Sequence, residues 1–402
     1  MERLSALLGL GVFIGFAYLI SNNRKAVRWQ PVLWGFALQI AFALIILRTA
    51  VGFKIFSWVG NIVNAFLDFS DAGASFVFGE NFQDFFFAFK VLPTIIFFSA
   101  FISLLYHYGV LQQVVGAIAR IMMRTMKTSG SETLSAAGNI FVGQTEAPLL
   151  IKPYVASMTM SELHAVMTGG FATVAGGVLA AYVSFGIPAE HLIAASVMSA
   201  PAALAMSKIM FPETEESPTK GRVDIEVEKT CANGIDAIAS GALEGLKLAL
   251  NVGAVIIAFL AILAALNAFI GFLGGLAGYP DLSLEVILAA LLAPVAWLMG
   301  VPIADCNAIG ALLGKKTIIN EFIAYLDLQA LIESEAISNR AAIIATYALC
   351  GFANIGSIGI QIGGIGGIAP SRQADLARIG LRAMIAGTLA CFTTACIAGI
   401  LL

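Results

Sequence analysis

Charge is what this chain has least of. Asp, Glu, Lys and Arg make up 12% of its 402 residues, while apolar residues make up 59%. A soluble domain carries about 25% charged residues, so this chain has too little charge to cover a surface in water. We therefore expect a lipid bilayer as its solvent. With a net charge of −3 and no basic tract, the sequence predicts no nucleic-acid partner.

Cysteine and histidine are also few. The five cysteines form no CxxC pair and lie mostly in apolar runs, where unpaired thiols behave as small hydrophobic side chains. His107, His164 and His191 are scattered toward the ends of apolar runs, which argues against a histidine metal centre. There is no HExxH motif, no aspartate dyad and no nucleophile paired with a base. An intramembrane enzyme using two carboxylates is the alternative, but the sequence predicts a protein that is not an enzyme.

Long apolar runs, by contrast, fill the chain. A membrane-spanning helix needs about 20 apolar residues, and the runs that we expect to span are 4–21, 31–47, 85–108, 162–185, 191–211, 243–272, 336–368 and 376–402. No small-residue cleavage site follows the first run, so we expect a retained span rather than a signal peptide. Residues 53–68 place apolar side chains at helical spacing and predict an interfacial amphipathic helix. Residues 69–84 are loop-like.

Two further apolar stretches are interrupted by polar residues and proline. Residues 138–150 (GNIFVGQTEAPLL) hold a carboxylate and two side-chain amides within the first stretch, 133–155. Pro294, Gly300 and Asp305 interrupt the second, 284–313. Irregular backbone at membrane depth is tolerated only where protein buries it or it lines a cavity, and a carboxylate there costs about 2.5–3.5 kcal/mol. We expect two re-entrant helical hairpins at a functional site.

The distribution of lysine and arginine predicts an orientation. If the basic cluster at 24–28 is cytoplasmic, threading eight spans places the basic residues of 120–127, 220–229 and 372–378 on the same side. Lys54 and the pair at 315–316 are exceptions. Both hairpins must re-enter for this scheme to hold, and both termini then lie outside.

The chain also contains an internal repeat. Residues 170–176 (GFATVAG) resemble residues 351–357 (GFANIGS), and each copy follows an interrupted stretch. By the threading above, the two copies run in opposite directions. An inverted repeat with glycine-interrupted spans points to the midplane site of a transporter. Glycine also serves helix–helix packing, and this is the interpretation that we favour for the glycine pairs at 363–364 and 366–367.

The polar residues of these motifs match a particular kind of solute. Carboxylates and amides bind hydroxyls and heterocycle edges, and an aromatic face accepts a planar ring. Without an arginine, the set suits a neutral solute with hydroxyls and a flat ring. Asn139, Thr173 and nearby unwound carbonyls offer oxygen ligands for a hard cation. A helix-capping role is the alternative for Asn139.

At these motifs the sequence resembles the concentrative nucleoside transporters, of the bacterial, eight-span, sodium-coupled type. The resemblance rests on GNIFVGQTEAPLL, GGFATVAGGVLAAYVSFG, INEFIAY and CGFANIGSIGI and covers nearly the whole chain. It implies an all-α polytopic membrane protein with eight transmembrane helices, two re-entrant hairpins, an inverted repeat and interfacial helices. It also implies a homotrimer in a bacterial inner membrane that imports nucleosides such as uridine or adenosine by an elevator-type movement.

The resemblance also implies roles for individual residues. The residues facing the nucleobase would be Gln144, Thr145, Glu146 and Val178, with Phe352 at or near the base. The residues holding the ribose hydroxyls would be Glu321, Asn354 and Ser357. The Na⁺ ligands would be Asn139, Thr173 and the carbonyls of Val142 and Val174. Na⁺ would be the coupling ion, without an organic cofactor. A proton-coupled symporter is the main alternative. Proton-coupled relatives tend to carry a GQSE-type tip, so the QTEAP version here favours Na⁺. A passive channel is a further alternative.

The same resemblance divides the chain into parts. Residues 1–110 would form a scaffold part with spans 1–3 and the interfacial helix. Residues 111–211 would form the first half of a transport part. Residues 212–275 would contribute a charged loop and the sixth, scaffold span. Residues 276–402 would form the second half of the transport part.

Overall fold

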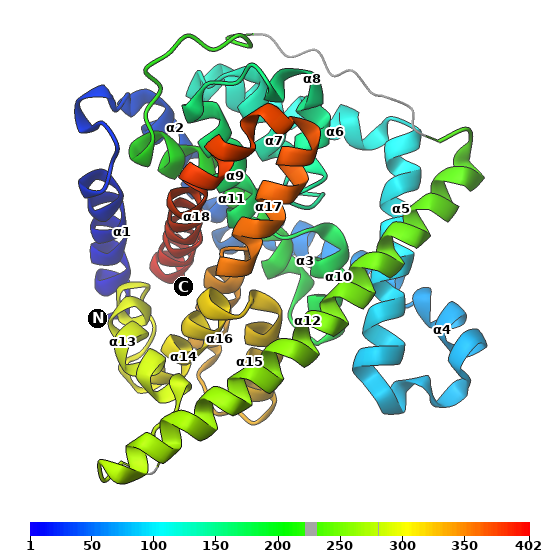
Figure 1. Ribbon diagram of the computed structural model, residues 1–402, viewed down its shortest axis with the longest axis vertical. Coiled ribbons are helices and arrows are strands. Elements are labelled where there is room, and N and C mark those ends of the chain that lie inside the picture. The colour runs from blue at the N-terminus through cyan, green and yellow to red at the C-terminus, as the bar shows by residue number, and fades with distance from the viewer. Residues whose placement is uncertain (222–230, 280) are drawn as a thin grey trace.

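A computed structural model describes residues 1–221, 231–279 and 281–402 of the chain, and its regular structure there is helical (Figure 1). The α-helices are α1 (Glu2–Leu19), α2 (Trp29–Arg48), α3 (Ala50–Leu67), α4 (Ser70–Phe78), α5 (Leu92–His107), α6 (Val110–Met126), α7 (Gly130–Gly138), α8 (Lys152–Val155), α9 (Met160–Ala172), α10 (Gly176–Ser184), α11 (Ala189–Met210), α12 (Gly234–Leu276), α13 (Leu284–Leu298), α14 (Cys306–Ile318), α15 (Glu321–Glu333), α16 (Asn339–Leu349), α17 (Ile355–Ile368) and α18 (Gln373–Leu401).

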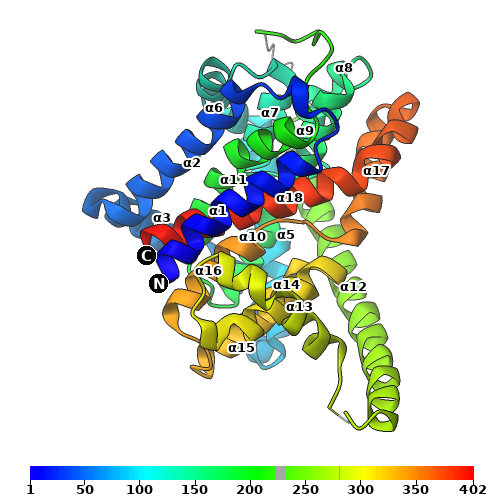
Figure 2. The ribbon, with the colours of Figure 1, turned by 90° about the vertical axis from the view of Figure 1, so that its left-hand side faces the viewer.

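Helices with nearly all side chains buried form the centre of the molecule. In α9, α11 and α18 most residues are inaccessible, and α1 lies alongside α18, as Figure 2 shows. The peripheral helix α12 is 43 residues long and packs along α5, with most of its apolar side chains exposed (Figure 1). An exposed apolar surface of this extent marks contact with lipid or with another subunit. The predicted all-α membrane fold is confirmed.

Eight helical segments among the described residues are long and apolar enough to cross a membrane. Seven coincide with predicted spans, and the eighth is Ala50–Phe78. The prediction of a loop over 69–84 is wrong, because α4 occupies Ser70–Phe78 and Glu80–Phe85 forms a 3₁₀ turn. Asp71 supports the first turn of α4 by its charge, and Gly79 ends the helix with φ +88°. The interfacial position of residues 53–68 stays a prediction.

The predicted seventh span, 336–368, is wrong as a single helix. It consists of α16, with 11 residues, and α17, with 14 residues, separated by an extended segment around Gly351. The glycine content explains the break, since Gly351 has φ +155° and approaches neighbouring backbone closely. Asn354 then caps α17, accepting a hydrogen bond from the Ser357 amide at 2.8 Å. The predicted fourth span is interrupted in the same way between α9 and α10.

The two breaks meet at the centre of the molecule. The Phe352 amide donates to the Thr173 carbonyl at 3.1 Å, so each break satisfies a polar backbone group of the other. The Gly176 amide donates to the Phe141 carbonyl at 3.2 Å, which ties the first break to the hairpin tip. The two copies of the internal repeat are therefore in direct main-chain contact.

Two helical hairpins lie against these breaks. In the first, α7 ends at Gly138 and the chain returns through the 3₁₀ turn Ala147–Ile151 and α8. In the second, α13 and α14 pack against each other across the turn at Gly300. Both hairpins occupy the predicted stretches. Their entry and exit on one membrane face stay a prediction.

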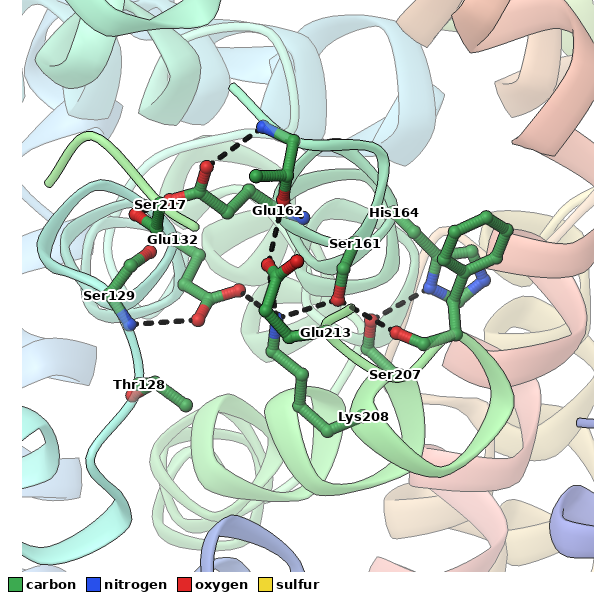
Figure 3. A network of polar contacts seen from close by, with 12 residues as sticks. Thr128, Ser129, Glu132, Ser161, Glu162, His164, Ser207, Lys208, Glu213 and Ser217 are labelled. Carbon is green, nitrogen blue, oxygen red and sulfur yellow. Dashed lines mark hydrogen bonds and ion pairs between the residues drawn. The ribbon is translucent and has the colours of Figure 1, made fainter. Parts of the chain in front are cut away.

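A buried polar network fastens the base of the first hairpin (Figure 3). Lys208 of α11 forms an ion pair with Glu132 of α7 at 2.6 Å and donates to the Ser161 hydroxyl of α9 at 2.8 Å. Glu132 and Glu162 each accept the main-chain amide three residues earlier, at 2.9 Å, and so cap α7 and α9. This base network joins three helices at one point.

The segment after α11 closes the base network. The Ser217 hydroxyl donates to Glu162 at 2.6 Å, and the Gly130 amide donates to the Thr219 carbonyl at 3.0 Å. At the same end of the molecule the Asn22 amide bonds the Met210 carbonyl at 2.8 Å. Of the basic cluster predicted over 220–229, Lys220 lies in this segment, whereas Arg222 and Lys229 lie outside the described residues.

We expect Gly351→Ala to destabilise the crossing of the two breaks. A β-carbon at Gly351 would lie 2.6 Å from the Phe171 carbonyl oxygen and 2.7 Å from the Cys391 sulfur, so the backbone must move. Overpacking of this kind costs about 1–3 kcal/mol. Thermal unfolding of the purified protein should show a lowered midpoint. Gly363→Ala is the matched control, since nothing lies within 4 Å of its β-carbon position, and an equal loss in both variants would contradict the explanation.

Candidate functional site

The tip of the first hairpin is hydrogen-bonded to α17. The side-chain oxygen of Gln144 accepts from Gln361 Nε2 at 2.9 Å, and Gln144 Nε2 donates to the Ser357 hydroxyl at 3.4 Å. Gln361 Nε2 also donates to the Met167 carbonyl of α9 at 3.2 Å. All three side chains are buried. The structure therefore brings the predicted residues Gln144 and Ser357 together although they are 213 positions apart.

A carboxylate occupies the start of α15 beside the second break. Glu321 accepts from Asn354 Nδ2 at 3.0 Å and from the Tyr182 hydroxyl at 3.0 Å, and its side chain is 4% exposed. Asn320 caps α15 by accepting the Ile323 amide at 3.0 Å, which fixes the helix start and with it the direction of Glu321. Asn354 and Ser357 bond to each other through the cap of α17. Glu321, Asn354, Ser357 and Gln144 thus form one continuous polar set.

The other predicted recognition residues surround this set. Thr145 is half-buried and packs against Gly364 of α17, where an added β-carbon would lie 2.6 Å from the Thr145 methyl group. Val178 is buried in α10, and Phe352 is half-buried in the second break. None of these three has a hydrogen bond from its side chain to the polar set within the described part of the chain.

Glu146 faces a cavity instead. This cavity has a volume of about 1180 Å³ and separates the first hairpin from α5 and α12. Its polar lining includes Lys152 of α8, Tyr106 of α5 and Glu244 of α12. The side chain of Glu146 is exposed to this space, so it can meet a solute that enters from the cavity.

Sequence reasoning missed two residues of the site. Tyr182 lies in the apolar part of GGVLAAYVSFG, and Gln361 is the only side-chain amide in α17. A side-chain amide in a helix made almost entirely of isoleucine and glycine is a functional signal at membrane depth. Applied to α17, that rule would have identified Gln361, whereas the hydroxyl of a buried tyrosine gives no comparable signal.

A second group of oxygen atoms lies where α7 ends. Asn139 is 1% exposed, and neither its side-chain oxygen nor its nitrogen has a hydrogen-bond partner among the described residues. Its amide nitrogen lies next to Gly169, whose β-carbon would be 3.1 Å away. The Thr173 hydroxyl donates to the Gly169 carbonyl at 2.9 Å. The predicted ligands Asn139 and Thr173 are thus both adjacent to Gly169.

The donor set fits a hard monovalent cation. A buried amide without a partner costs about 1–3 kcal/mol, and an ion bound to the Asn139 oxygen would offset part of that cost. The predicted carbonyls of Val142 and Val174 lie in the hairpin tip and the first break, and neither accepts a hydrogen bond from another described residue. All of these atoms are neutral oxygens, which hard cations prefer.

Family models cover the chain in three consecutive parts. Residues 8–81 match the model "Na+ dependent nucleoside transporter N-terminus", and residues 191–399 match its C-terminal counterpart. Residues 88–189 match a model described as "Gate: Nucleoside recognition". The first hairpin and the first break lie within that third part.

Proteins similar over the whole chain occur in vertebrates. Solute carrier family 28 member 3 of the hagfish Eptatretus stoutii is 49% identical over 98% of this chain and 60% of its own length. Its Homo sapiens counterpart is 47% identical over 100% of this chain and 60% of its own. Sodium/nucleoside cotransporter 1 of Homo sapiens is 47% identical over 100% of this chain and 64% of its own length. The chain therefore spans about 60% of the length of these relatives.

Solved structures match over nearly their full length. CNTnw in an inward-facing substrate-bound state superposes with a TM-score of 0.95 at 41% identity, covering 100% of this chain and 98% of that one. A double variant of CNTnw in an outward-facing state superposes with a TM-score of 0.94 at 40% identity, again covering 100% of this chain and 98% of that one.

Proposed function

Because the chain belongs to the family of Na⁺-dependent nucleoside transporters, we propose that it carries a nucleoside across a membrane together with Na⁺. The observation that carries this proposal is the continuous polar set of Glu321, Asn354, Ser357 and Gln144 between the hairpin tip and the second break. The set contains one carboxylate and no arginine, so it suits a neutral solute with hydroxyl groups.

The ribose is held by the second half of the repeat in this proposal. Glu321 offers carboxylate lone pairs to hydroxyl donors, and its orientation is fixed beforehand by Tyr182 and Asn354. Preorganised hydrogen-bonding groups lose little entropy on binding. Asn354 and Ser357 complete the ribose contacts. Gln144, Thr145, Glu146 and Val178 face the base, with Phe352 against or beside it.

Sodium binds beside the nucleoside site, at Asn139, Thr173 and the carbonyls of Val142 and Val174. The ligand set is neutral, so the ion keeps its charge while it is carried. Each Na⁺ transported inward gains about 2.3 kcal/mol per 100 mV of negative-inside potential. The ion supplies the driving force for uptake of a neutral solute against its gradient.

Alternating access follows from the division into two kinds of parts. The transport part carries both hairpins and both breaks and consists of residues 111–211 and 276–402. It slides across the membrane in an elevator-type movement relative to a scaffold formed by residues 1–110 and 212–275. The cavity beside Glu146 lies between hairpin and scaffold helices and is the route by which the solute leaves or enters. The exposed apolar face of the scaffold packs in a homotrimer within a bacterial inner membrane, with both termini outside.

Uptake of labelled uridine and adenosine into proteoliposomes tests the function. A Na⁺ gradient should drive accumulation, a negative-inside potential should accelerate it, and internal unlabelled nucleoside should stimulate uptake by exchange. Accumulation driven by a proton gradient in Na⁺-free medium would favour the proton-coupled alternative. Flux without exchange stimulation would favour a channel, and absence of nucleoside flux under every gradient would contradict the proposal.

We expect Asn139→Ala to raise the Na⁺ concentration needed for half-maximal uridine uptake several-fold. The substitution removes a buried amide oxygen from the ion site and leaves the nucleoside contacts in place, so uptake at saturating Na⁺ should change less. The measurement is a Na⁺ titration of initial uptake rates. Asn22→Ala is the control, because the Asn22 side chain is exposed outside the helices. An unchanged Na⁺ dependence would exclude Asn139 as a ligand.

A further inference from the structure

Gln361 contacts two acceptors with a single amide group. Its Nε2 lies 3.2 Å from the Met167 main-chain oxygen and 2.9 Å from Gln144 Oε1, and the side chain is fully buried. A main-chain carbonyl only accepts hydrogen bonds, so the end of the Gln361 amide that faces Met167 must be its nitrogen. The orientation of Gln361 is therefore fixed by the backbone of α9.

The fixed amide of Gln361 determines the orientation of Gln144. An amide nitrogen carries two hydrogens, and the second one is directed at Gln144, which must answer with its oxygen. The nitrogen of Gln144 then faces the opposite way, toward Ser357 at 3.4 Å. Without Gln361, the Gln144 amide could rotate by half a turn and exchange its donor and acceptor ends at little steric cost.

Gly170 keeps this arrangement in place. A β-carbon there would lie 2.8 Å from Gln144 Cβ and 2.9 Å from Gln361 Nε2, so only glycine leaves room for both side chains at once. The two amides are thus packed against the first copy of the repeat. Their relative position is set by α9 as well as by α17.

We propose that Gln361 is a specificity-determining positioning residue that makes Gln144 a hydrogen-bond donor to the bound base. This inference rests on the proposed function and deepens it. The group of the base that meets Gln144 is an acceptor, either a carbonyl oxygen or an unprotonated ring nitrogen. Gln361 itself touches Gln144 and Met167 and acts on the ligand only through Gln144.

Sulfur analogues of uridine test the donor role of Gln144. Replacing the 2-oxygen or the 4-oxygen by sulfur keeps every other atom of the nucleoside but makes one acceptor larger and weaker. In equilibrium binding to the purified wild-type protein, we expect 2-thiouridine or 4-thiouridine to bind about two- to tenfold more weakly than uridine, the range of one neutral hydrogen bond. If neither analogue binds more weakly, Gln144 does not donate to a carbonyl of uridine and the proposal fails.

Substitution at Gln361 tests its positioning role. Gln361→Met removes the orienting donor but keeps a side chain of similar size. The thio penalty, meaning the factor by which a thiouridine binds more weakly than uridine, should then fall close to its value in Gln144→Met, which lacks the amide altogether. A penalty caused only by the larger size of sulfur would persist in both variants. Gln361→Glu replaces the donor by an acceptor and should turn the Gln144 nitrogen away from the base, weakening uridine binding further. Ile360→Met, at an exposed position on the same helix, is the control and should show the same thio penalty as the wild-type protein.

The outcomes separate the two proposals. If both Gln361 variants unfold at the wild-type temperature and still show the full wild-type thio penalty, Gln361 does not position Gln144 and the proposal is overturned. If one variant does not fold, the other and the wild-type analogue series still decide. Absence of uridine binding to the wild-type protein would instead contradict the proposed function. A loss of affinity in Gln361→Met that is equal for uridine and both thio analogues would assign Gln361 a structural role only.

Discussion

Glu321→Gln is expected to weaken uridine binding on the order of 10- to 100-fold. Hydrogen bonds to a charged group contribute about 1.5–3 kcal/mol each, and Glu321 is the only carboxylate in the polar set. Neutralising it also places an amide nitrogen opposite Asn354 Nδ2 or the Tyr182 hydroxyl, where the structure requires acceptors. Equilibrium binding of labelled uridine to the purified protein measures the loss.

Deoxynucleosides show whether Glu321 reads the ribose. The wild-type protein should prefer uridine to its 2′- and 3′-deoxy analogues, and Glu321→Gln should remove most of that preference. Glu333→Gln, at the exposed end of the same helix, should bind as the wild type does. An equal loss for ribo- and deoxynucleosides would mean that Glu321 supports the fold of the site rather than contacting a hydroxyl.

Lys208→Met is expected to produce the largest loss of stability among single substitutions at the base network. Lys208 is buried and pairs with Glu132 at 2.6 Å, within reach of Glu213 at 3.9 Å. Removing one partner of a buried pair leaves an uncompensated charge and costs about 3–5 kcal/mol. Thermal unfolding of the purified protein should show a strongly lowered midpoint, and the yield of folded protein should fall.

A second substitution distinguishes charge from packing. Lys208→Met combined with Glu132→Gln removes both members of the pair and should recover a substantial part of the stability. Lys220→Met, an exposed lysine in the neighbouring segment, should leave the midpoint unchanged. If the double variant were as unstable as Lys208→Met alone, the lysine would be acting through its packing and not through its charge.

Much of the fold was predictable because lipid imposes strong rules on sequence. Apolar length identified seven of the eight segments that can span, and proline with polar residues identified both hairpins. The same length rule failed for 336–368, because mean hydropathy does not register a break whose backbone groups are satisfied by another segment, here Thr173. It failed for 69–84 because short helices held by tertiary packing have weak local signals.

The site was predictable where a polar residue stood in a recognisable motif. Gln144, Glu321, Asn354 and Ser357 were predicted, and the structure joins them in one set. The contact between Gln144 and Gln361 spans 217 positions, and no periodicity within either helix encodes it. Tyr182 was missed for the same reason, since only the fold shows that its hydroxyl meets a carboxylate.

The base network has a consequence for the order in which the protein is made. Ser131 and Thr219, which bond across it at 2.8 Å, are 88 positions apart. At about 5–20 residues per second of translation, Ser131 is synthesised roughly 4–18 seconds before Thr219, the residue that closes the base of the first hairpin. For most of that interval Lys208, the partner of Glu132, has not been synthesised either. The hairpin therefore completes its folding only after α11 and the following segment have emerged from the ribosome.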